Sequence, residues 1–191
     1  MAINLSKGQK IDLTKSNPGL TKIFVGLGWD TNKYDGGKDF DLDVSVFCTN
    51  GAGKVDNEKN FVYFNNKENE NGSVIHSGDN LTGAGAGDDE QIKVDLSTIP
   101  ASIEKVAFTI TIYDAVARNQ NFGQVSNAYA RIVNEADGQE LIRFDLGEDF
   151  SIETGVVVGE LYRHSGEWKF SAVGNGYKDG LDGLTRDYGL V

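Results

Sequence analysis

Cysteine and proline are scarce in this sequence of 191 residues, which contains one cysteine and two prolines. Because Cys48 stands alone, no intrachain disulfide can form, and no cysteine-rich zinc site is possible. The chain also lacks an apolar run of the roughly 18 residues that a membrane helix needs, and its N-terminus has no apolar signal-peptide core. We therefore expect a cytoplasmic protein in a reducing compartment, without membrane insertion.

Basic residues are outnumbered by acidic ones, with 18 Lys and Arg against 29 Asp and Glu and a net charge of -11. No run of basic residues is present to neutralise phosphates, so nucleic acids and anionic membranes are poor partners. Hydrophobic residues make up 39% of the chain, which excludes intrinsic disorder. The length and composition predict one globular domain over residues 1–191.

Glycine is abundant, with 24 residues, and it separates short apolar runs without a collagen-like period. This pattern is typical of all-β proteins and predicts an antiparallel β-sandwich with short peripheral helices at 114–120 and 177–188. The predicted strands are 10–14, 22–29, 41–48, 60–65, 91–96, 105–113, 127–133, 140–146, 156–164 and 167–173. Tight hairpins are predicted at Asn50-Gly51, Asp137-Gly138 and Ser165-Gly166.

The apolar faces of these strands define the expected core. Its predicted members are Leu27, Phe40, Leu42, Val44, Val46, Phe61, Phe108, Ile110, Ile112, Phe144 and Trp168. A faint internal repeat also places Trp29-Asp30 on Tyr113-Asp114 and Asn50 on Asn134. This match indicates either two related halves or a coincidence, and only the first half has an acidic strand.

Acidic residues cluster at that strand. Asp30 ends one apolar strand, and Asp39, Asp41 and Asp43 follow at alternate positions, so that they share one face of the next strand. Neighbours on one face lie roughly 7 Å apart, and their carboxylates repel one another unless water or a cation lies between them. The pattern indicates either a cation site or a solvated strand face.

A second acidic cluster lies in the segment 78–90. Asp79 stands at its beginning, Asp88, Asp89 and Glu90 stand at its end, and alternate glycines between them allow tight backbone curvature. Carboxylate and backbone oxygens are the ligands that Ca²⁺ prefers, whereas Mg²⁺ keeps more of its water. The segment is therefore a candidate calcium loop or a flexible acidic loop.

Asn65 and Asn66 follow a short apolar strand and could add amide oxygens, although the pair by itself indicates only a turn. The familiar short motifs do not fit the acidic clusters. An EF-hand begun at Asp39 has Val44 where glycine is needed and Asn50 where glutamate is needed. The glycine-rich stretch is a single copy rather than a stacked calcium β-helix array, and it lacks the Lys-Ser or Lys-Thr of a P-loop.

Several motifs, in one order over nearly the whole chain, closely resemble the bacterial TerD family of tellurium-resistance and general stress proteins. They are Leu5-Ser6-Lys7-Gly8, Val25-Gly26-Leu27-Gly28-Trp29-Asp30, Asp39-Phe40-Asp41-Leu42-Asp43, Phe64-Asn65-Asn66, Gly78-Asp79-Asn80, Thr82-Gly83, Gly87-Asp88-Asp89-Glu90 and Gly159-Glu160-Leu161-Tyr162-Arg163. The resemblance implies a calcium-binding β-sandwich with two ions at the acidic clusters, a link to tellurite resistance and wider stress responses, and no established reaction.

We predict that the acidic side chains converge at one end of the sandwich around two calcium ions, because folding would otherwise bring repelling charges together. Asp39 is expected to support this site from outside it, and Asp114 is expected to lie apart from it. The predicted ligands are Asp30, Asp41, Asp43, Asp79, Asp88, Asp89 and Glu90, with neutral oxygens from Asn65 and Asn66.

Two alternatives differ in class from a non-enzymatic calcium protein. A two-metal phosphoryl-transfer or hydrolytic enzyme could use the same acids. Catalysis by Cys48, His76 or His164 is not favoured, because Cys48 lies in an apolar run and the histidines lack catalytic or metal-binding spacing. A metal-free interaction module could use Trp29, Trp168, Tyr113 and Tyr162 as anchors. The expected partners are calcium ions and other stress-response proteins.

Overall fold

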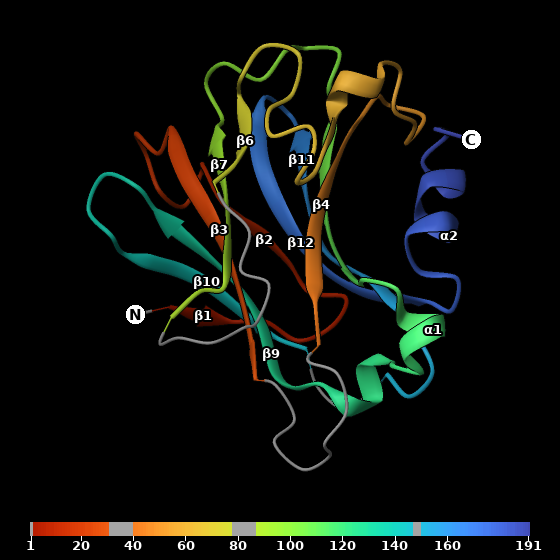
Figure 1. The fold of residues 1–191 in the computed structure, drawn as a ribbon. Helices are drawn as coiled ribbons and strands as arrows, with labels where there is room; N and C mark the ends of the chain where they lie inside the picture. The colour runs from red at the N-terminus through yellow and green to blue at the C-terminus, as the bar shows by residue number, and fades with distance from the viewer. Residues whose placement is uncertain (1, 31–39, 78–86, 147–149) are drawn as a thin grey trace.

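The computed structural model describes residues 2–30, 40–77, 87–146 and 150–191, which form two packed β-sheets (Figure 1). Sheet A has the order β1 (Ile3–Asn4), β10 (Glu140–Asp145), β9 (Ser126–Asn134), β3 (Lys22–Asp30), β7 (Glu90–Asp95) and β6 (Val74–His76). Sheet B has the order β2 (Lys10–Asp12), β12 (Glu167–Tyr177), β11 (Gly155–His164), β8 (Lys105–Ile112), β4 (Leu42–Thr49) and β5 (Phe61–Val62). Except for the parallel pair β1 and β10, the described strand pairs are antiparallel. The predicted antiparallel β-sandwich is confirmed.

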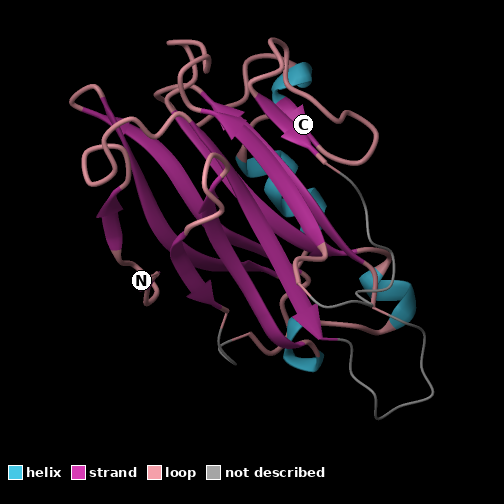
Figure 2. Ribbon diagram, turned by 90° about the vertical axis from the view of Figure 1, so that its left-hand side faces the viewer, coloured by secondary structure: helices cyan, strands magenta, loops and turns pink. Residues whose placement is uncertain are grey.

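The helices are short and peripheral. They are the 3₁₀ helices η1 (Glu58–Asn60) and η2 (Phe122–Gln124) and the α-helices α1 (Ala115–Arg118) and α2 (Gly180–Asp187). Helix α2 covers the outer face of sheet B, where Leu184 packs in a small cluster with Phe47 and Val157 (Figure 1). In Figure 2 the strands of sheet A lie in front of the helices, so this sheet faces the viewer with its outer surface. Within the described ranges, no helix combines the length and apolarity needed to cross a bilayer.

The main core lies between the two sheets and contains almost all of the predicted residues. Leu27, Phe40, Leu42, Val44, Val46, Phe108, Ile110, Ile112, Phe144 and Trp168 are buried as predicted. Phe61 is a correction, because it is only partly buried. Its ring stacks on Phe47 with 4.7 Å between centroids, in the smaller cluster on the outer face of sheet B.

Two of the three predicted hairpins are confirmed. The Asp137-Gly138 turn joins β9 to β10, and Ser165-Gly166 joins β11 to β12 with φ angles of 53° and 79°. The tight hairpin predicted at Asn50-Gly51 is wrong. The Asn50 side chain accepts hydrogen bonds from the backbone N–H groups of Ala52 and Lys54, which holds a wider turn, and η1 follows before β5 begins.

The strand bounds differ from the prediction mainly at short strands. β1 and β6 were not predicted, because neither lies in a longer alternating run, whereas the equally short β2 and β5 lie within the predicted runs 10–14 and 60–65. β12 continues to Tyr177, so α2 begins only at Gly180.

The internal repeat has a structural counterpart. In sheet A the strands β10, β9 and β3 are neighbours in that order, and in sheet B the strands β5, β4 and β8 are neighbours in the same way. This arrangement matches β3 with β8 and β4 with β9.

Candidate acidic site

The run Asp88-Asp89-Glu90 leads into β7, and its side chains point in three different directions. The Asp89 backbone N–H donates to the Leu27 carbonyl at 2.7 Å, and Asp89 Oδ2 accepts from the Trp29 backbone N–H at 2.9 Å. These two bonds fasten the beginning of β7 to the end of β3, where Asp30 stands. Residues 60 positions apart in the sequence are thereby joined at one end of sheet A.

Glu90 points into the space between the sheets and is only 2% exposed. Its Oε2 accepts a hydrogen bond from the Val44 backbone N–H at 3.1 Å and lies 3.1 Å from Nε2 of His76. His76 is 3% exposed. Since His76 and Glu90 belong to sheet A and Val44 belongs to sheet B, this group links the two sheets beside the beginning of β4.

Asp88 lies on the outer face of sheet A, and its side chain is 0% exposed. Arg131 donates to both carboxylate oxygens, from Nε to Oδ1 at 2.7 Å and from Nη2 to Oδ2 at 2.9 Å. The Tyr129 hydroxyl donates to Oδ1 at 3.0 Å, and the Gln91 amide donates to Oδ2 at 3.0 Å. Two donors therefore satisfy each oxygen, in the fork geometry that makes arginine–carboxylate pairs strong.

These contacts also perturb the groups around Asp88. Burial, together with the Asp88 charge, raises the pKa of the Tyr129 hydroxyl to about 12. The hydrogen bond to Asp88 raises the pKa of Arg131 above its already high ordinary value. At neutral pH the Arg131 guanidinium is therefore charged and the Tyr129 phenol is neutral.

Two glycines of β3 make room for this arrangement. Gly26 and Gly28 lie two positions apart on the outer face of sheet A, because Leu27 between them belongs to the core. A Cβ atom on Gly26 would come 2.1 Å from Asp88 Oδ2, and one on Gly28 would come 2.4 Å from the Tyr129 ring. Asp88 and Tyr129 thus pack directly against the backbone of β3 at these two glycines.

The acids of β4 have different neighbours. Asp43 alternates with the core residues Leu42 and Val44, so it shares the outer face of sheet B with Ser45 and Phe47. Asp41 lies just before β4, where its backbone carbonyl accepts from the Tyr113 N–H at 2.8 Å. Both side chains are half-buried. Asp43 and Asp88 therefore lie on opposite outer faces of the sandwich.

The remaining predicted ligands are distributed as follows. Asp30 is exposed, and its Oδ2 accepts from the Asn127 side chain at 2.6 Å. Asn66 closes a turn, because its amide donates to the carbonyls of Phe61 at 2.6 Å and Lys59 at 3.1 Å. Asn65 is exposed beside it. Asp79 and Asp39 lie outside the described residues.

The structure thus brings Asp30 and Asp89 to the end of β3 and Glu90 to the beginning of β4, and it directs Asp88 elsewhere. Within the described ranges, no three His, Cys, Asp or Glu side chains form a group that could hold a metal ion. Sequence reasoning missed Arg131 and Tyr129, the partners of Asp88. The spacing of Gly26 and Gly28 on one strand face was the available signal, since glycine inside a strand often marks a close approach by another group.

The groups considered for enzymatic chemistry are placed as follows. Cys48 is buried, and burial raises the pKa of its thiol to about 12, so the reactive thiolate is not formed at neutral pH. His76 is buried against Glu90, and His164 is exposed at the end of β11.

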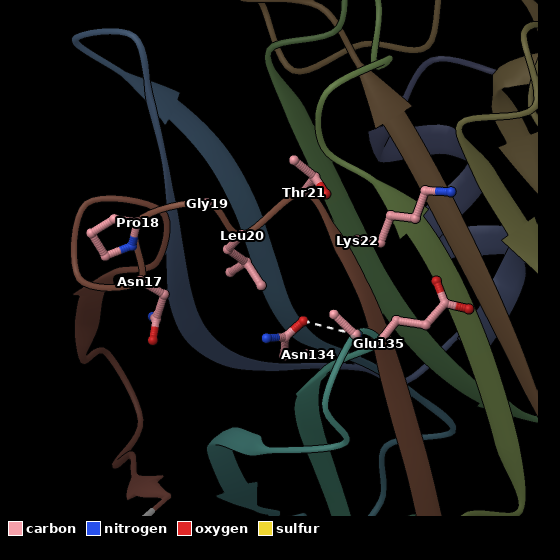
Figure 3. A pocket seen from close by; sticks show the side chains of 9 residues that line it. Asn17, Pro18, Gly19, Leu20, Thr21, Lys22, Asn134 and Glu135 are labelled. Carbon is pink, nitrogen blue, oxygen red and sulfur yellow. Dashed lines mark hydrogen bonds between the residues drawn. The ribbon is translucent and has the colours of Figure 1, made fainter.

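A hollow of about 340 Å³ lies at another place on sheet A, between residues 17–22 and the turn at 134–136 (Figure 3). Lys22 and Glu135 line it, and the backbone N–H of Glu135 donates to the Lys22 carbonyl at 3.0 Å. None of the predicted ligands lines this hollow. The candidate site is therefore the region where β3, β4 and β7 meet, rather than this hollow.

Comparison with known proteins agrees with this architecture. The family model of the TerD domain matches residues 1–188. General stress protein 16U of Bacillus subtilis (strain 168) is 66% identical over 190 residues, covering 100% of this chain and 98% of that protein. Tellurium resistance protein TerD of Serratia marcescens is 49% identical over 190 residues, covering 100% of this chain and 98% of its own length.

Among solved structures, a homologue of telluride resistance protein (TerD) from Streptomyces coelicolor A3(2) has the same fold, with a TM-score of 0.68 and 23% identity. The match covers 83% of this chain and 91% of the chain of that structure. The family model and the relatives lead to one assignment: the chain belongs to the TerD family of tellurium-resistance and general stress-response proteins.

Proposed function

We propose that this TerD-family chain is a non-enzymatic calcium-binding protein of the stress response, and that it binds two Ca²⁺ ions where β3, β4 and β7 meet. The observation that carries the proposal is the pair of links from the beginning of β7. Asp89 binds the end of β3 through the Trp29 N–H, and Glu90 binds the beginning of β4 through the Val44 N–H. Asp89 thus lies beside the end of β3, and Glu90 lies beside the beginning of β4.

The sequence of those two segments supports the proposal. Segment 31–39 contains Asp35 and Asp39, and segment 78–86 contains Asp79. Asp30, Asp41 and Asp89 flank these segments in the sequence, and we infer that the acids of both segments meet theirs. Oxygen donors of this kind suit Ca²⁺, which takes six to eight oxygen ligands, and a divalent ion would offset the repulsion between them.

We revise the proposed ligand set in one respect. Asp88 is assigned to the outer face of sheet A, because its two oxygens already accept from Arg131, Tyr129 and Gln91. The proposed carboxylate ligands are therefore Asp30, Asp41, Asp43, Asp79, Asp89 and Glu90, with Asn65 and Asn66 as neutral donors.

The proposal of a non-enzymatic role is supported by the state of the candidate nucleophile, the buried and protonated thiol of Cys48. A cytoplasmic location is proposed from the same residue, since a single unpaired cysteine is typical of a reducing compartment. Other stress-response proteins are proposed as partners, on the basis of the names of the relatives.

Calorimetric titration of EDTA-treated protein with Ca²⁺ tests the proposal, with Mg²⁺ as the control ion. We expect two ions to bind and the melting temperature to rise, since a ligand present at a hundredfold excess over its Kd contributes about 2.7 kcal/mol. Asp89→Asn should weaken the binding, whereas Asp137→Asn, a surface substitution at the β9–β10 turn, should not.

Two outcomes would contradict the proposal. One is the absence of both binding heat and a change in melting temperature between EDTA and millimolar Ca²⁺ at neutral pH. The other is hydrolysis of a phosphoester in the presence of Mn²⁺ or Mg²⁺ that Asp89→Asn abolishes, which would make the acids an enzymatic two-metal site.

A further inference from the structure

A second hollow, of about 390 Å³, lies between η1 and the C-terminal end of the chain (Figure 1). Its apolar walls are Phe61 and Tyr63 on one side and Leu190 on the other, and its polar lining includes Glu58 and Lys59. Ligand pockets in proteins usually measure about 300–1,000 Å³, are mainly apolar, and carry a few polar groups that orient the ligand. This hollow is at the lower end of that range, so it suits a small molecule.

The aromatic wall is one end of a row of stacked rings. Phe61 lies between Phe47 and Tyr63, with centroid distances of 4.7 and 4.6 Å and interplanar angles of 24° and 21°. Tyr188 continues the row beyond Phe47 at 4.4 Å. Phe61 and Tyr63 are only partly buried, so the row presents aromatic surface to the hollow. Because aromatic rings associate favourably with further rings, either stacked or edge-on, this wall favours a ligand that contains a ring.

Hydrogen bonds fix both walls. The Asn66 amide donates to the Lys59 carbonyl at 3.1 Å, and the backbones of Tyr63 and Asn66 exchange two bonds of 3.0 Å. On the other side, the Leu190 N–H donates to the Thr185 carbonyl at 2.9 Å. A ligand that enters a hollow with fixed walls loses less of its binding free energy to ordering of the protein.

The two charged residues of the lining are neighbours in η1 and have opposite signs. Glu58 and Lys59 are both exposed, and in the described part of the chain neither forms an ion pair. A molecule that carries an ammonium group, a carboxylate and an aromatic ring complements this lining. Its carboxylate would pair with Lys59, its ammonium with Glu58, and its ring would lie against the aromatic wall.

We propose that this hollow is a binding site for free amino acids with an aromatic side chain. The ring occupies the space beside Phe61 and Tyr63, and Lys59 and Glu58 bind the two charged groups at the rim. Such a site is independent of the proposed calcium binding, because it uses neither charge of the acidic site.

Calorimetric titration with L-phenylalanine tests the proposal, together with three analogues that each lack one part. Phenethylamine lacks the carboxylate, 3-phenylpropionate lacks the ammonium group, and L-alanine lacks the ring. We expect L-phenylalanine to bind with a Kd of about 1 mM or lower. Phenethylamine and 3-phenylpropionate should each bind about 5-fold more weakly, the upper range for one exposed ion pair, and L-alanine should show no saturable binding.

Two variants assign the charges. Lys59→Met should weaken the binding of L-phenylalanine about 5-fold and leave that of phenethylamine unchanged, because phenethylamine has no carboxylate. Glu58→Gln should weaken the binding of L-phenylalanine to the same extent, and 3-phenylpropionate should bind at least as tightly as before. Lys67→Met is the matched control, because Lys67 is exposed next to Asn66 but does not line the hollow.

Three results would overturn the proposal. One is the absence of saturable L-phenylalanine binding at about 10 mM. Another is equal affinity of the wild-type protein for L-phenylalanine and the two analogues that lack a charge. The third is a set of ligand-induced NMR shifts that lies outside residues 58–66 and 185–191. Circular dichroism checks that the variants are folded, and the analogue series on the wild-type protein decides the question if one of them is not.

Discussion

The carboxylate of Asp88 rests directly on the backbone of Gly26, so closely that a Cβ atom at position 26 would come 2.1 Å from Oδ2. A side chain at position 26 and the present position of Asp88 therefore exclude each other. We expect Gly26→Ala to lower the free energy of unfolding by about 1–3 kcal/mol, the usual cost of overpacking, and to weaken the bond between Asp88 and Arg131. Urea denaturation measures this change.

Gly51→Ala is the matched control for this substitution. The nearest atom to a Cβ at Gly51 is 3.7 Å away in the Glu104 side chain, an ordinary van der Waals contact. Its free energy of unfolding should stay within about 0.5 kcal/mol of the wild-type value, as for most surface substitutions. Equal effects of the two substitutions would contradict the close packing of Asp88 against the backbone of Gly26.

The Tyr129 hydroxyl gives a prediction for alkaline pH. Burial, reinforced by the Asp88 charge, raises its pKa from the ordinary value of 10 to about 12. A group whose pKa is raised on folding stabilises the protein fully below its unfolded pKa, and this contribution is lost as the pH rises through the folded pKa. Stability should therefore fall between pH 10 and about 12.

Tyr129→Phe identifies the contribution of this residue. In an ultraviolet titration of tyrosine ionisation, the variant should lack one of the late-titrating groups, and its stability should depend less on pH above 10. Identical titration curves for the two proteins would show that the Tyr129 hydroxyl is not held against Asp88.

The buried pair of His76 and Glu90 should contribute much more to stability than a surface pair does. His76→Phe keeps a ring but removes the Nε2 partner of Glu90 Oε2. Removing this contact from the buried Glu90 side chain, whose Oε2 keeps the Val44 N–H, should cost about 1–3 kcal/mol. Lys93→Ala, which breaks the exposed Lys93–Glu135 pair, should cost less than about 1 kcal/mol.

Chemical denaturation of these two variants provides the measurement. A cost for His76→Phe no larger than that for Lys93→Ala would mean that the contact between the sheets adds little. A larger cost would support Glu90 as a link that holds β4 against β7.

Cys48 should resist alkylation in the folded protein. Burial raises the pKa of the thiol to about 12, and only the thiolate reacts quickly. Iodoacetamide in mildly alkaline buffer should therefore label Cys48 stoichiometrically in guanidinium but very slowly under native conditions, as followed by mass spectrometry. Rapid native labelling would show that the interior opens around β4.

The strand pattern was predictable because the alternation is local. Phe40, Leu42 and Val44 face the core as the period of two requires, and Asp41 and Asp43 take the other direction. Phe61 was less predictable, because α2 covers the outer face of sheet B and makes that face apolar as well. Alternation alone then does not tell which of the two faces an apolar residue occupies. The turn at Asn50 depends on side-chain hydrogen bonds that the Asn-Gly pair does not reveal.

Candidate acids could be recognised in the sequence, but their directions could not. The run Asp88-Asp89-Glu90 consists of three similar acids in the sequence, yet each side chain forms a hydrogen bond with a residue of a different strand. Arg131 comes from β9, Trp29 from β3 and Val44 from β4. Only the register of those strands determines which acid pairs with an arginine and which acids accept from the backbone of β3 and β4.

The sequence by itself determined the fold class, most of the core and the family, because these depend on periodicity, composition and an ordered set of motifs along the whole chain. Only the tertiary structure decided that Asp88 pairs with Arg131, that Asp89 binds β3 and that Glu90 binds β4. The physical reason is that hydrogen bonds and ion pairs act over about 3 Å, and residues distant in sequence come that close only when the sheets are assembled.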